Sequence, residues 1–343
     1  MNINKMLEDG LIPNDLDIYK SFMVTHNKFE EYHKIVCSIS GGADSDVMLD
    51  LFCKFDKNKV TFVFFDTGLE YQATKDHLKY LEEKYDIEIV RIKAEKPIPL
   101  VCRDNGEPFL SKQVSENIKR LQKHNFQWED EPFEILRERY CTLNDKGEWR
   151  GCLSALMWWC NERGEKSRFN INYNKWLREF IIANPPTFKI SPDCCKYAKK
   201  NVSKHFIAEN DFDLNCYGVR KAEGGVRATA YKNCFTTRKE DDYKIDEYRP
   251  IFWYKDETKE VYENFFDVTH SKCYSEYGLK RTGCSGCPFG RDFEFELSVL
   301  EKFEPKLHKA VTNIFKNSYE YTRKYKEFCK MMDDEVKKKK EGN

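Results

Sequence analysis

The stretch KIVCSISGGADSDVMLDLF, residues 34–52, decides the fold. Its first part is a short run of apolar and β-branched residues, which predicts a buried strand over residues 34–40. Its second part repeats apolar residues at helical spacing and predicts a helix over residues 44–55. A tight polar turn with two glycines joins them. A strand that enters a helix through such a turn is typical of the first unit of an α/β sheet.

The same alternation continues beyond this stretch. Residues 60–68, VTFVFFDTG, predict a second buried strand, residues 70–85 an amphipathic helix, and residues 87–94 a third strand. We therefore expect an α/β fold, a parallel twisted sheet with flanking helices of the Rossmann-like type. Ligands of such sheets bind at the carboxyl ends of the strands, where the turn after residue 39 and the segment after residue 65 both fall.

The remaining sequence predicts a domain organisation around this sheet. Residues 1–33 form a helical lead-in, residues 34–290 the main domain, and residues 291–343 a helical C-terminal tail. The strand–helix rhythm stops from about residue 95 to residue 190, which predicts a helical insertion with helices at 111–124, 154–163 and 172–184. The rhythm then resumes with strands expected at 214–220 and 248–254, and a helix at 258–269 that Thr258 caps.

Composition narrows the class of protein. The 343 residues include 58 basic and 58 acidic side chains, a balance that gives no overall attraction to nucleic acid or to an anionic membrane. No apolar run approaches the roughly 18–20 residues of a membrane helix, and the acidic N-terminus does not resemble a signal peptide. We expect a cytoplasmic protein without a membrane partner. In that reducing compartment, the 14 cysteines are core residues, metal ligands or catalytic thiols rather than disulfides.

The turn after the first strand has the properties of an anion site. Gly41 and Gly42 allow the backbone to approach a ligand closely, and the helix that follows offers unpaired N–H groups and a positive dipole end. Phosphate is the usual guest of such a cradle. Ser40 and Ser45 add hydroxyl donors, while Asp44 caps the helix or positions a metal ion. The alternative is a plain strand–helix turn with a polar cap.

Residues 40–45, SGGADS, look like the SGGxDS motif of the PP-loop ATP pyrophosphatase superfamily. Within it, the chain resembles the phosphoadenylyl-sulfate (PAPS) reductase family. The resemblance covers roughly residues 33–95 and 190–290, and three further stretches carry it. They are FFDTGLEYQAT at 64–74, CYGVRKAEGGVRA at 216–228, and the cysteine pairs in DCCKYAKK at 193–200 and GCSGCP at 283–288.

The resemblance implies a PP-loop site for an adenine nucleotide, either ATP with Mg²⁺ or (phospho)adenylyl sulfate. It assigns catalytic roles to Asp44, Ser45 and Arg220. Arg220 and Arg227 carry guanidinium forks that suit phosphate or sulfate. The alternative role for both is surface ion pairing. The implied nucleotide-binding residues are Ser40, Gly41, Gly42, Asp44, Ser45, Asp66, Thr67, Gly68, Arg220 and Arg227.

The resemblance also implies a [4Fe-4S] cluster on Cys194, Cys195, Cys284 and Cys287. Four thiolates can ligate one iron–sulfur cubane, and adjacent cysteines suit its neighbouring corners. Structural zinc, which prefers spaced pairs on both sides, and two unrelated buried pairs are the alternatives. Cys152 and Cys160 either pack in the core or supply a fifth ligand. A lysine run follows the first pair, as a solvated face or as compensation of cluster charge, at Lys196, Lys199, Lys200 and Lys204.

Two departures from the reductase pattern shape the expected reaction. The turn is complete except that Ala43 replaces the common lysine, and the tail carries only Cys329, without the Glu-Cys-Gly-x-His segment of thiol-dependent reductases. We expect ATP-dependent, adenylating sulfur transfer to an acceptor, for which nucleic acid is a candidate. The donor would be a thioredoxin-like or cysteine-desulfurase-like protein. The alternatives are a sulfonucleotide reductase that forms sulfite and a non-catalytic nucleotide-binding module with a structural metal.

Overall fold

The computed structural model describes residues 2–224, 229–237 and 245–341, which group into two compact units. Unit 1 comprises residues 1–95, 198–285 and 298–307. Unit 2 comprises residues 96–197, 286–297 and 308–343. Three helices continue from one unit into the other: the π-helical turn η3 (Lys196–Lys200), α15 (Phe293–Phe303) and α16 (Pro305–Ile314).

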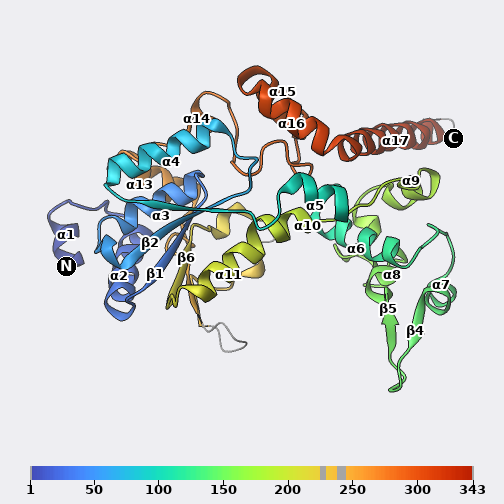
Figure 1. Cartoon of the computed structure of the whole chain (residues 1–343), viewed down its shortest axis with the longest axis horizontal. Helices are drawn as coiled ribbons and strands as arrows, with labels where there is room; N and C mark the ends of the chain where they lie inside the picture. Colours follow the sequence, from blue (N-terminus) through green and yellow to red (C-terminus); the bar gives the residue numbers. More distant parts are fainter. Residues whose placement is uncertain (1, 225–228, 238–244, 342–343) are drawn as a thin grey trace. The chain divides into compact units, whose positions relative to one another are not determined.

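Unit 1 is built on a six-stranded sheet of order β3-β2-β1-β6-β8-β7 (Figure 1). All neighbouring strands are parallel except β7, which pairs antiparallel with β8. The fold class is therefore the α/β class that the sequence predicts. The strands are β1 (Ile35–Ile39), β2 (Val60–Asp66), β3 (Ile89–Lys93), β6 (Leu214–Tyr217), β7 (Phe235–Thr236) and β8 (Asp246–Tyr248).

Strand order creates a switch point between β1 and β6. From β1 the chain adds β2 and β3 on one side, whereas β6 and β8 lie on the other side. Ile35 pairs in parallel with both Val60 and Leu214, so the three strands run in register and end at the same edge. Open α/β sheets bind ligands at the carboxyl ends of the strands that flank such a point. The segments after β1, β2 and β6 meet there.

Both faces of this sheet are covered, as alternating side chains require. Ile35, Cys37 and Ile39 point into the larger core, which helices α2, α3, α4 and α13 complete. Val36 and Val63 point to the opposite face, against Phe206 of α11. The helices confined to unit 1 are α1 (Ile3–Glu8), α2 (Leu16–Glu31), α3 (Ala43–Phe52), η1 (Lys57–Lys59), α4 (Gln72–Tyr85), α11 (Asn201–Glu209), η4 (Lys221–Glu223), α13 (Asp256–Phe266) and α14 (Lys272–Ser275).

Unit 2 is mainly helical and has its own aromatic core, in which Trp158, Trp159, Phe180 and Tyr321 are buried. A short antiparallel hairpin of β4 (Cys141–Leu143) and β5 (Trp149–Gly151) interrupts the helices; the sequence analysis does not anticipate it. The helices are α5 (Ile98–Asn105), α6 (Lys112–Lys123), α7 (Phe133–Tyr140), α8 (Leu153–Trp159), η2 (Ile171–Tyr173), α9 (Leu177–Ala183), α10 (Asp193–Cys195) and α17 (Lys316–Glu341).

Three sequence predictions of local structure are wrong in detail. The strand expected at 248–254 ends at Tyr248, since Pro250 has no N–H for a ladder and turns follow. The helix expected at 258–269 spans Asp256–Phe266, so Thr258 lies inside its first turn and Lys255 is the N-cap. The helix expected at 172–184 is divided by Trp176, which has a left-handed backbone with φ of 59°.

None of the helices in the described residues is both long and apolar enough to cross a bilayer. The longest one, α17, carries charged residues along its whole length.

Candidate functional site

The turn after β1 is shaped by close packing around its glycines. Gly41 has a φ of 65°, and a Cβ there would come within 2.6 Å of the Thr74 methyl group. Gly42 is the N-cap of α3, and a Cβ on it would lie 3.0 Å from the Thr282 hydroxyl. A side chain at Gly41 would therefore require both a strained backbone and displacement of α4.

The Ser45 hydroxyl organises this turn from inside. Ser45 is 3% exposed, and its Oγ donates to the Gly42 carbonyl oxygen over 2.8 Å. The Ser45 Oγ also lies 3.2 Å from the Gly42 amide nitrogen and 3.3 Å from the Ser40 amide nitrogen, and both amides can donate to it. These contacts hold the backbone between Ser40 and Ser45 in one conformation. The geometry assigns Ser45 a direct part in shaping the turn.

Two hydroxyl side chains lie over the amides of the turn. The Ala43 N–H donates to the hydroxyl of Tyr274 over 3.0 Å, and the Thr282 hydroxyl donates to the Gly41 carbonyl oxygen over 3.5 Å. Burial raises the pKa of Tyr274. One N–H at the start of α3 is thus already matched to a neutral oxygen atom.

Arg220 connects the segment after β6 to the first turn of α3. Its Nε donates to Asp44 Oδ1 over 2.9 Å, and its Nη1 donates to Asp256 Oδ1 over 2.7 Å. Burial raises the pKa of Asp44, and the positive charge of Arg220 works in the opposite direction. Asp44 does not cap α3, whose N-cap is Gly42; it orients the guanidinium instead.

Gly218 makes this approach possible. A Cβ at Gly218 would lie 2.7 Å from the Asp44 carbonyl oxygen and 3.0 Å from the Ser45 amide nitrogen. Only a residue without a side chain lets the β6 end pass so close to α3. The positive charge of Lys259, on α13, also lowers the pKa of Asp44. Position 43, next to Asp44, carries alanine and therefore no charge.

The segment after β2 forms a second polar cluster at the same sheet edge. Asp66 Oδ1 accepts from the Gly68 amide over 2.8 Å, and Glu70 Oε1 accepts from the Thr67 hydroxyl over 2.7 Å. Burial and a hydrogen bond with Asp66 raise the pKa of Glu70. Burial works against ionisation of Asp66 too, but the Glu70 hydrogen bond lowers its pKa. Glu70 is therefore harder to ionise than Asp66.

This second cluster contacts one of the predicted metal ligands. The Thr67 Oγ lies 3.4 Å from Cys284 Sγ. The positive charge of Lys199, on the π-helical turn after the first cysteine pair, acts on Glu70. Single π-helical turns are common at functional sites. Charged neighbours of Asp66 in unit 1 thus include Glu70, Lys75 and Lys93, and Lys199 acts on Glu70.

The remaining predicted metal ligands, Cys194, Cys195 and Cys287, belong to unit 2. The Cys102 thiol raises the pKa of Cys194, as do burial and the charge of Cys287, whereas the Cys195 thiol lowers it. In the described part of the chain, no group of three or more His, Cys, Asp or Glu side chains is arranged to hold a metal ion. The thiol donors suit iron or zinc chemically.

The other predicted side chains are placed as follows. Arg227 lies outside the described residues. Cys152, Trp158 and Trp159 are buried in the unit 2 core, and Cys160 packs against it, so packing is their observed role. Cys329 lies on α17, where its thiol contacts the Lys175 carbonyl oxygen.

A charged cluster also lies behind the turn. Asp46 is fully buried, and its Oδ2 lies 3.0 Å from His77 Nε2 and 2.8 Å from His270 Nδ1. The other nitrogen of His270 lies 2.7 Å from Glu263 Oε1. Burial lowers the pKa of His270, but the two carboxylates outweigh it and raise that pKa to about 9. Asp46 is therefore held beside a histidinium at neutral pH.

Part of the chain is similar to proteins of a known family. Residues 34–145 match the family model of the phosphoadenosine phosphosulfate reductase domain. The resemblance to the PAPS reductase family is confirmed. Adenosine 5'-phosphosulfate reductase 2 of Bacillus subtilis (strain 168) is 36% identical over 83 residues, 24% of this chain and 32% of that protein. An uncharacterized protein of Methanocaldococcus jannaschii, MJ0066, is 37% identical over 70 residues, 20% of this chain and 15% of that protein. The chain thus matches no more than about a third of the length of these relatives.

Two solved structures are also similar. PAPS reductase from Candida auris, in a phosphate complex, has a TM-score of 0.42 and 12% identity, covering 82% of this chain and 93% of that one. The U34-tRNA thiolase NcsA from Methanococcus maripaludis, with its [4Fe-4S] cluster, has a TM-score of 0.33 and 14% identity, covering 87% and 73%. Both TM-scores are below 0.5, so neither likeness bears on function.

Several residues of the candidate site were not predicted from the sequence. Gly218 and Glu70 stand inside the quoted motif stretches, and that position is the signal that would have found them. Tyr274, Thr282 and Cys102 carry no such signal, because their proximity depends on the packing of distant segments.

Proposed function

We propose that this PAPS reductase-family protein binds an adenine nucleotide on the turn of residues 40–45 and transfers sulfur after adenylating an acceptor with ATP. The single observation that carries the proposal is the glycine turn, with Ser45 buried at its centre and Arg220 directed at it from the segment after β6. Catalytic roles for Asp44, Ser45 and Arg220 are part of this proposal.

The turn would hold the phosphates of the nucleotide through the N–H groups at the start of α3, which favour anions. The Ala43 amide becomes available to a phosphate oxygen once Tyr274 rotates away. Ser40, Gly41, Gly42 and Ser45 would line the phosphate side, and Asp66, Thr67 and Gly68 would lie by the adenosine. Mg²⁺, Arg220 and Lys259 would balance the phosphate charge in the absence of a lysine at position 43. Arg227 is proposed to add a further cation.

In the reaction, an acceptor oxygen would attack the α-phosphate of ATP, a new P–O bond would form, and pyrophosphate would leave. Arg220 and the turn amides would stabilise the charge that develops on the α-phosphate oxygens. A sulfur nucleophile would then replace the adenylated oxygen and release AMP. Both steps conserve the oxidation state of phosphorus.

The cysteines suit the cofactor that this chemistry would use. Cys194, Cys195, Cys284 and Cys287 would hold a [4Fe-4S] cluster, since thiols are its natural ligands. When bound, the cluster would supply iron that can carry sulfide. The Cys284 Sγ lies 3.4 Å from the Oγ of Thr67, one of the residues proposed to lie by the adenosine. This contact supports a functional link between the Cys284 thiol and the nucleotide.

A second candidate is favoured by one comparison. The Bacillus relative is named an adenosine 5'-phosphosulfate reductase, and the same turn can accept adenylyl sulfate. This chain would then release sulfite with electrons from a thioredoxin-like donor. A non-catalytic nucleotide-binding module is the third candidate.

One set of assays separates these candidates. Anaerobically prepared protein is incubated with labelled ATP, Mg²⁺ and candidate acceptors, and separately with adenylyl sulfate and reduced thioredoxin. Acceptor-dependent release of pyrophosphate and AMP supports the first proposal. Sulfite release supports the second, and nucleotide binding without turnover in either assay supports the third. Iron and acid-labile sulfide analysis of the same sample tests the cluster.

Asp44→Asn and Asp256→Asn form a matched pair, because both carboxylates bind Arg220 but only Asp44 belongs to the turn. We expect Asp44→Asn to abolish turnover while iron content stays unchanged. Asp256→Asn should lower turnover by no more than about fivefold, since an exposed ion pair contributes about 1 kcal/mol or less. Equal losses in the two variants would contradict a catalytic role of Asp44.

A further inference from the structure

A fifth thiol lies near the cysteine site of unit 2. Cys102, near the end of α5, is close enough to Cys194, one of the proposed iron ligands, to raise the pKa of that thiol. Cys102 is 6% exposed and Cys194 is 5% exposed, so their contact is shielded from solvent. None of the fourteen cysteines, all of which lie in the described residues, forms a disulfide in the structure.

Two helices hold this contact in place. Asn105, three residues after Cys102 on the same face of α5, donates to Asp193 Oδ2 over 3.0 Å. Asp193 directly precedes Cys194 and also accepts from Lys119 over 2.7 Å. One face of α5 therefore matches two consecutive residues of α10. The thiol contact follows from this helix pairing and not from a single side-chain rotation.

The backbone on both sides of the helices is fixed as well. The Glu107 amide donates to the Lys189 carbonyl oxygen over 2.9 Å, and the Ser191 amide donates back to Glu107 over 2.9 Å. A Cβ at Gly106 would come within 2.4 Å of the same Lys189 oxygen, so glycine is required at this approach.

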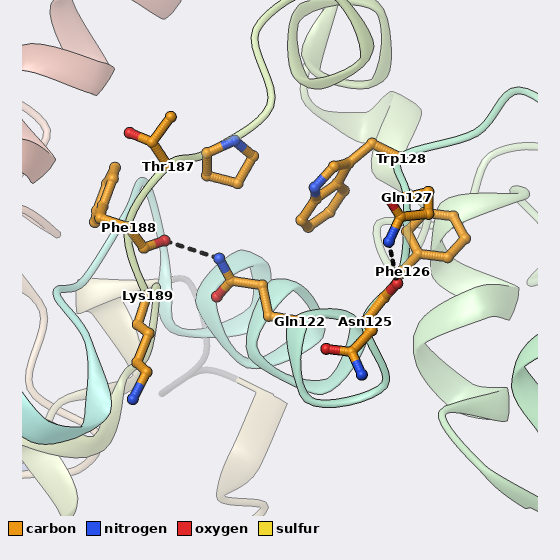
Figure 2. A pocket seen from close by; sticks show the side chains of 9 residues that line it. Gln122, Asn125, Phe126, Gln127, Trp128, Thr187, Phe188 and Lys189 are labelled. Atoms are coloured by element: carbon orange, nitrogen blue, oxygen red, sulfur yellow. Dashed lines mark hydrogen bonds between the residues drawn. The ribbon is translucent and has the colours of Figure 1, made fainter.

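The segment that leads to α10 is also tied to α6. The Gln122 side chain donates to the Phe188 carbonyl oxygen over 2.8 Å and accepts from the Ile190 amide over 2.9 Å. Figure 2 shows the side-chain amide of Gln122 between Phe188 and Trp128. The three residues line a surface cavity of about 320 Å³, and none of the predicted site residues line it. The approach of α5 to α10, which carry Cys102 and Cys194, is thus built into unit 2.

We propose that Cys102 and Cys194 form a reversible disulfide whenever Cys194 holds no metal, which makes this pair a redox modification site. The oxidant is a low-molecular-weight disulfide such as oxidised glutathione. The two thiols lose two protons and two electrons as their S–S bond forms, and the glutathione S–S bond breaks to give two glutathione thiols.

The pairing of Cys194 with Cys102 is preferred over pairing with its sequence neighbour. Disulfides usually join residues whose Cα atoms are about 4.4–6.8 Å apart, whereas consecutive Cα atoms across a trans peptide are about 3.8 Å apart. Cys195 is half-buried and in contact with Cys194. It therefore serves as the entry point: its thiolate attacks the external disulfide and releases one glutathione thiol. Cys194 then takes over the glutathione bound to Cys195, and Cys102 attacks the Cys194 sulfur and releases the second glutathione thiol.

The disulfide also affects the [4Fe-4S] cluster proposed above. This effect rests on the proposed function, whereas the disulfide itself does not. A Cys194 sulfur bonded to Cys102 is not a thiolate and cannot ligate iron. Oxidised protein would then take up iron only after reduction. Cys102 would protect the ligand thiol from irreversible oxidation while the site is empty.

The test begins with full-length protein prepared without iron. It is treated with oxidised glutathione, alkylated with N-ethylmaleimide, and mapped by peptide mass spectrometry. We expect a peptide pair linked through Cys102 and Cys194 that disappears after reduction with dithiothreitol. Alkylation of both residues after oxidation, or a link from Cys194 to another cysteine, would overturn the proposal.

Iron uptake gives a second readout that does not depend on nucleotide turnover. After the oxidation step, wild-type protein and the control Cys160→Ser should take up little iron until dithiothreitol is added. Cys102→Ser should bind the same amount of iron as wild type in the reduced series. After oxidation, its peptide with Cys194 and Cys195 should carry glutathione instead of a link to Cys102. An oxidised Cys102→Ser without bound glutathione would refute the exchange route, and its failure to bind iron when reduced would refute the non-ligand role of Cys102. If no variant binds iron, the cluster proposal fails and the peptide map alone decides the disulfide.

Discussion

The Nε atom of Arg220 lies 2.9 Å from Oδ1 of Asp44, across the gap between the β6 end and the first turn of α3. The two residues are 176 positions apart in the chain. They meet because β6 inserts beside β1 in the sheet. The first prediction follows from this pair.

Arg220→Lys should weaken ATP binding and lower stability together. Lysine keeps the positive charge but cannot bind Asp44 and Asp256 with one planar fork. A hydrogen bond between charged groups contributes about 1.5–3 kcal/mol, and Arg220 is 8% exposed, so we expect a loss of that size in the free energy of unfolding. Urea denaturation and calorimetric ATP titration measure the two effects. Arg91→Lys, at a half-exposed ion pair with Glu82, should cost less than about 1 kcal/mol; a similar cost in both variants would contradict the assigned role.

Gly218→Ala should destabilise unit 1, since the added Cβ would lie 2.7 Å from the Asp44 carbonyl oxygen. We expect a loss of about 1–3 kcal/mol, which is typical of overpacking, together with weaker nucleotide binding because the turn must shift. Gly283→Ala is the control, as a Cβ there meets no atom within 4 Å. Chemical denaturation of both variants tests the contrast, and an unaffected Gly218→Ala would mean that β6 does not approach α3 so closely.

Stability should depend on pH through His270. Its pKa is about 9 in the folded chain against 6.5 for an ordinary histidine, so its contribution is complete below pH 6.5 and is lost as the pH rises through about 9. The shift corresponds to about 3 kcal/mol at most. The charged and titratable groups near it include Asp46 of α3, His77 of α4, Glu263 and Lys259 of α13, and Tyr274 of α14. Hydrogen bonds from both histidines outweigh burial and lower the pKa of Asp46, so its contribution is lost only in acid.

Thermal unfolding of wild type and His270→Gln between pH 6 and 10 measures this effect. The wild-type unfolding free energy should fall across the alkaline range more steeply than that of the variant. Parallel pH profiles would show that His270 is not held as a cation by Asp46 and Glu263.

The two tryptophans of α8 allow a matched comparison in unit 2. Both are fully buried, but only Trp159 has a hydrogen-bond partner for its indole N–H, the Glu129 carbonyl oxygen at 2.9 Å. In the described residues the Trp158 indole nitrogen has none. Trp159→Phe should therefore cost about 1 kcal/mol more than Trp158→Phe. Urea unfolding followed by circular dichroism measures the two losses. A larger loss in Trp158→Phe than in Trp159→Phe would contradict the assigned hydrogen bond of Trp159.

The fold was predictable wherever a local pattern is complete. Strands β1, β2 and β3 and helices α3 and α4 follow from apolar periodicity and from the glycines between them. The strand expected after Tyr248 failed because an apolar run alone does not reveal that Pro250 breaks the ladder. The hairpin of β4 and β5 was missed because three-residue strands are too short to show an alternation.

The candidate site was predictable only in its local parts. Ser40, Gly41, Gly42 and Ser45 act within one turn, so their proximity is a property of the sequence itself. The pairing of Glu70 with Thr67 is equally local, but nothing in a single sequence separates this glutamate from the many solvated ones. The buried Asp46 among the polar residues after the turn is a similar case.

The amino-acid sequence by itself determined that a strand, a glycine turn and a helix follow one another, and that two cysteine pairs are present, because these features depend on neighbours in the chain. Only the tertiary structure decided that Arg220 and Gly218 face Asp44, that Tyr274 covers the Ala43 amide, and that Cys102 comes near Cys194. Strand order and helix packing bring those residues together, and both are set by the burial of apolar surface over the whole unit rather than by local pattern.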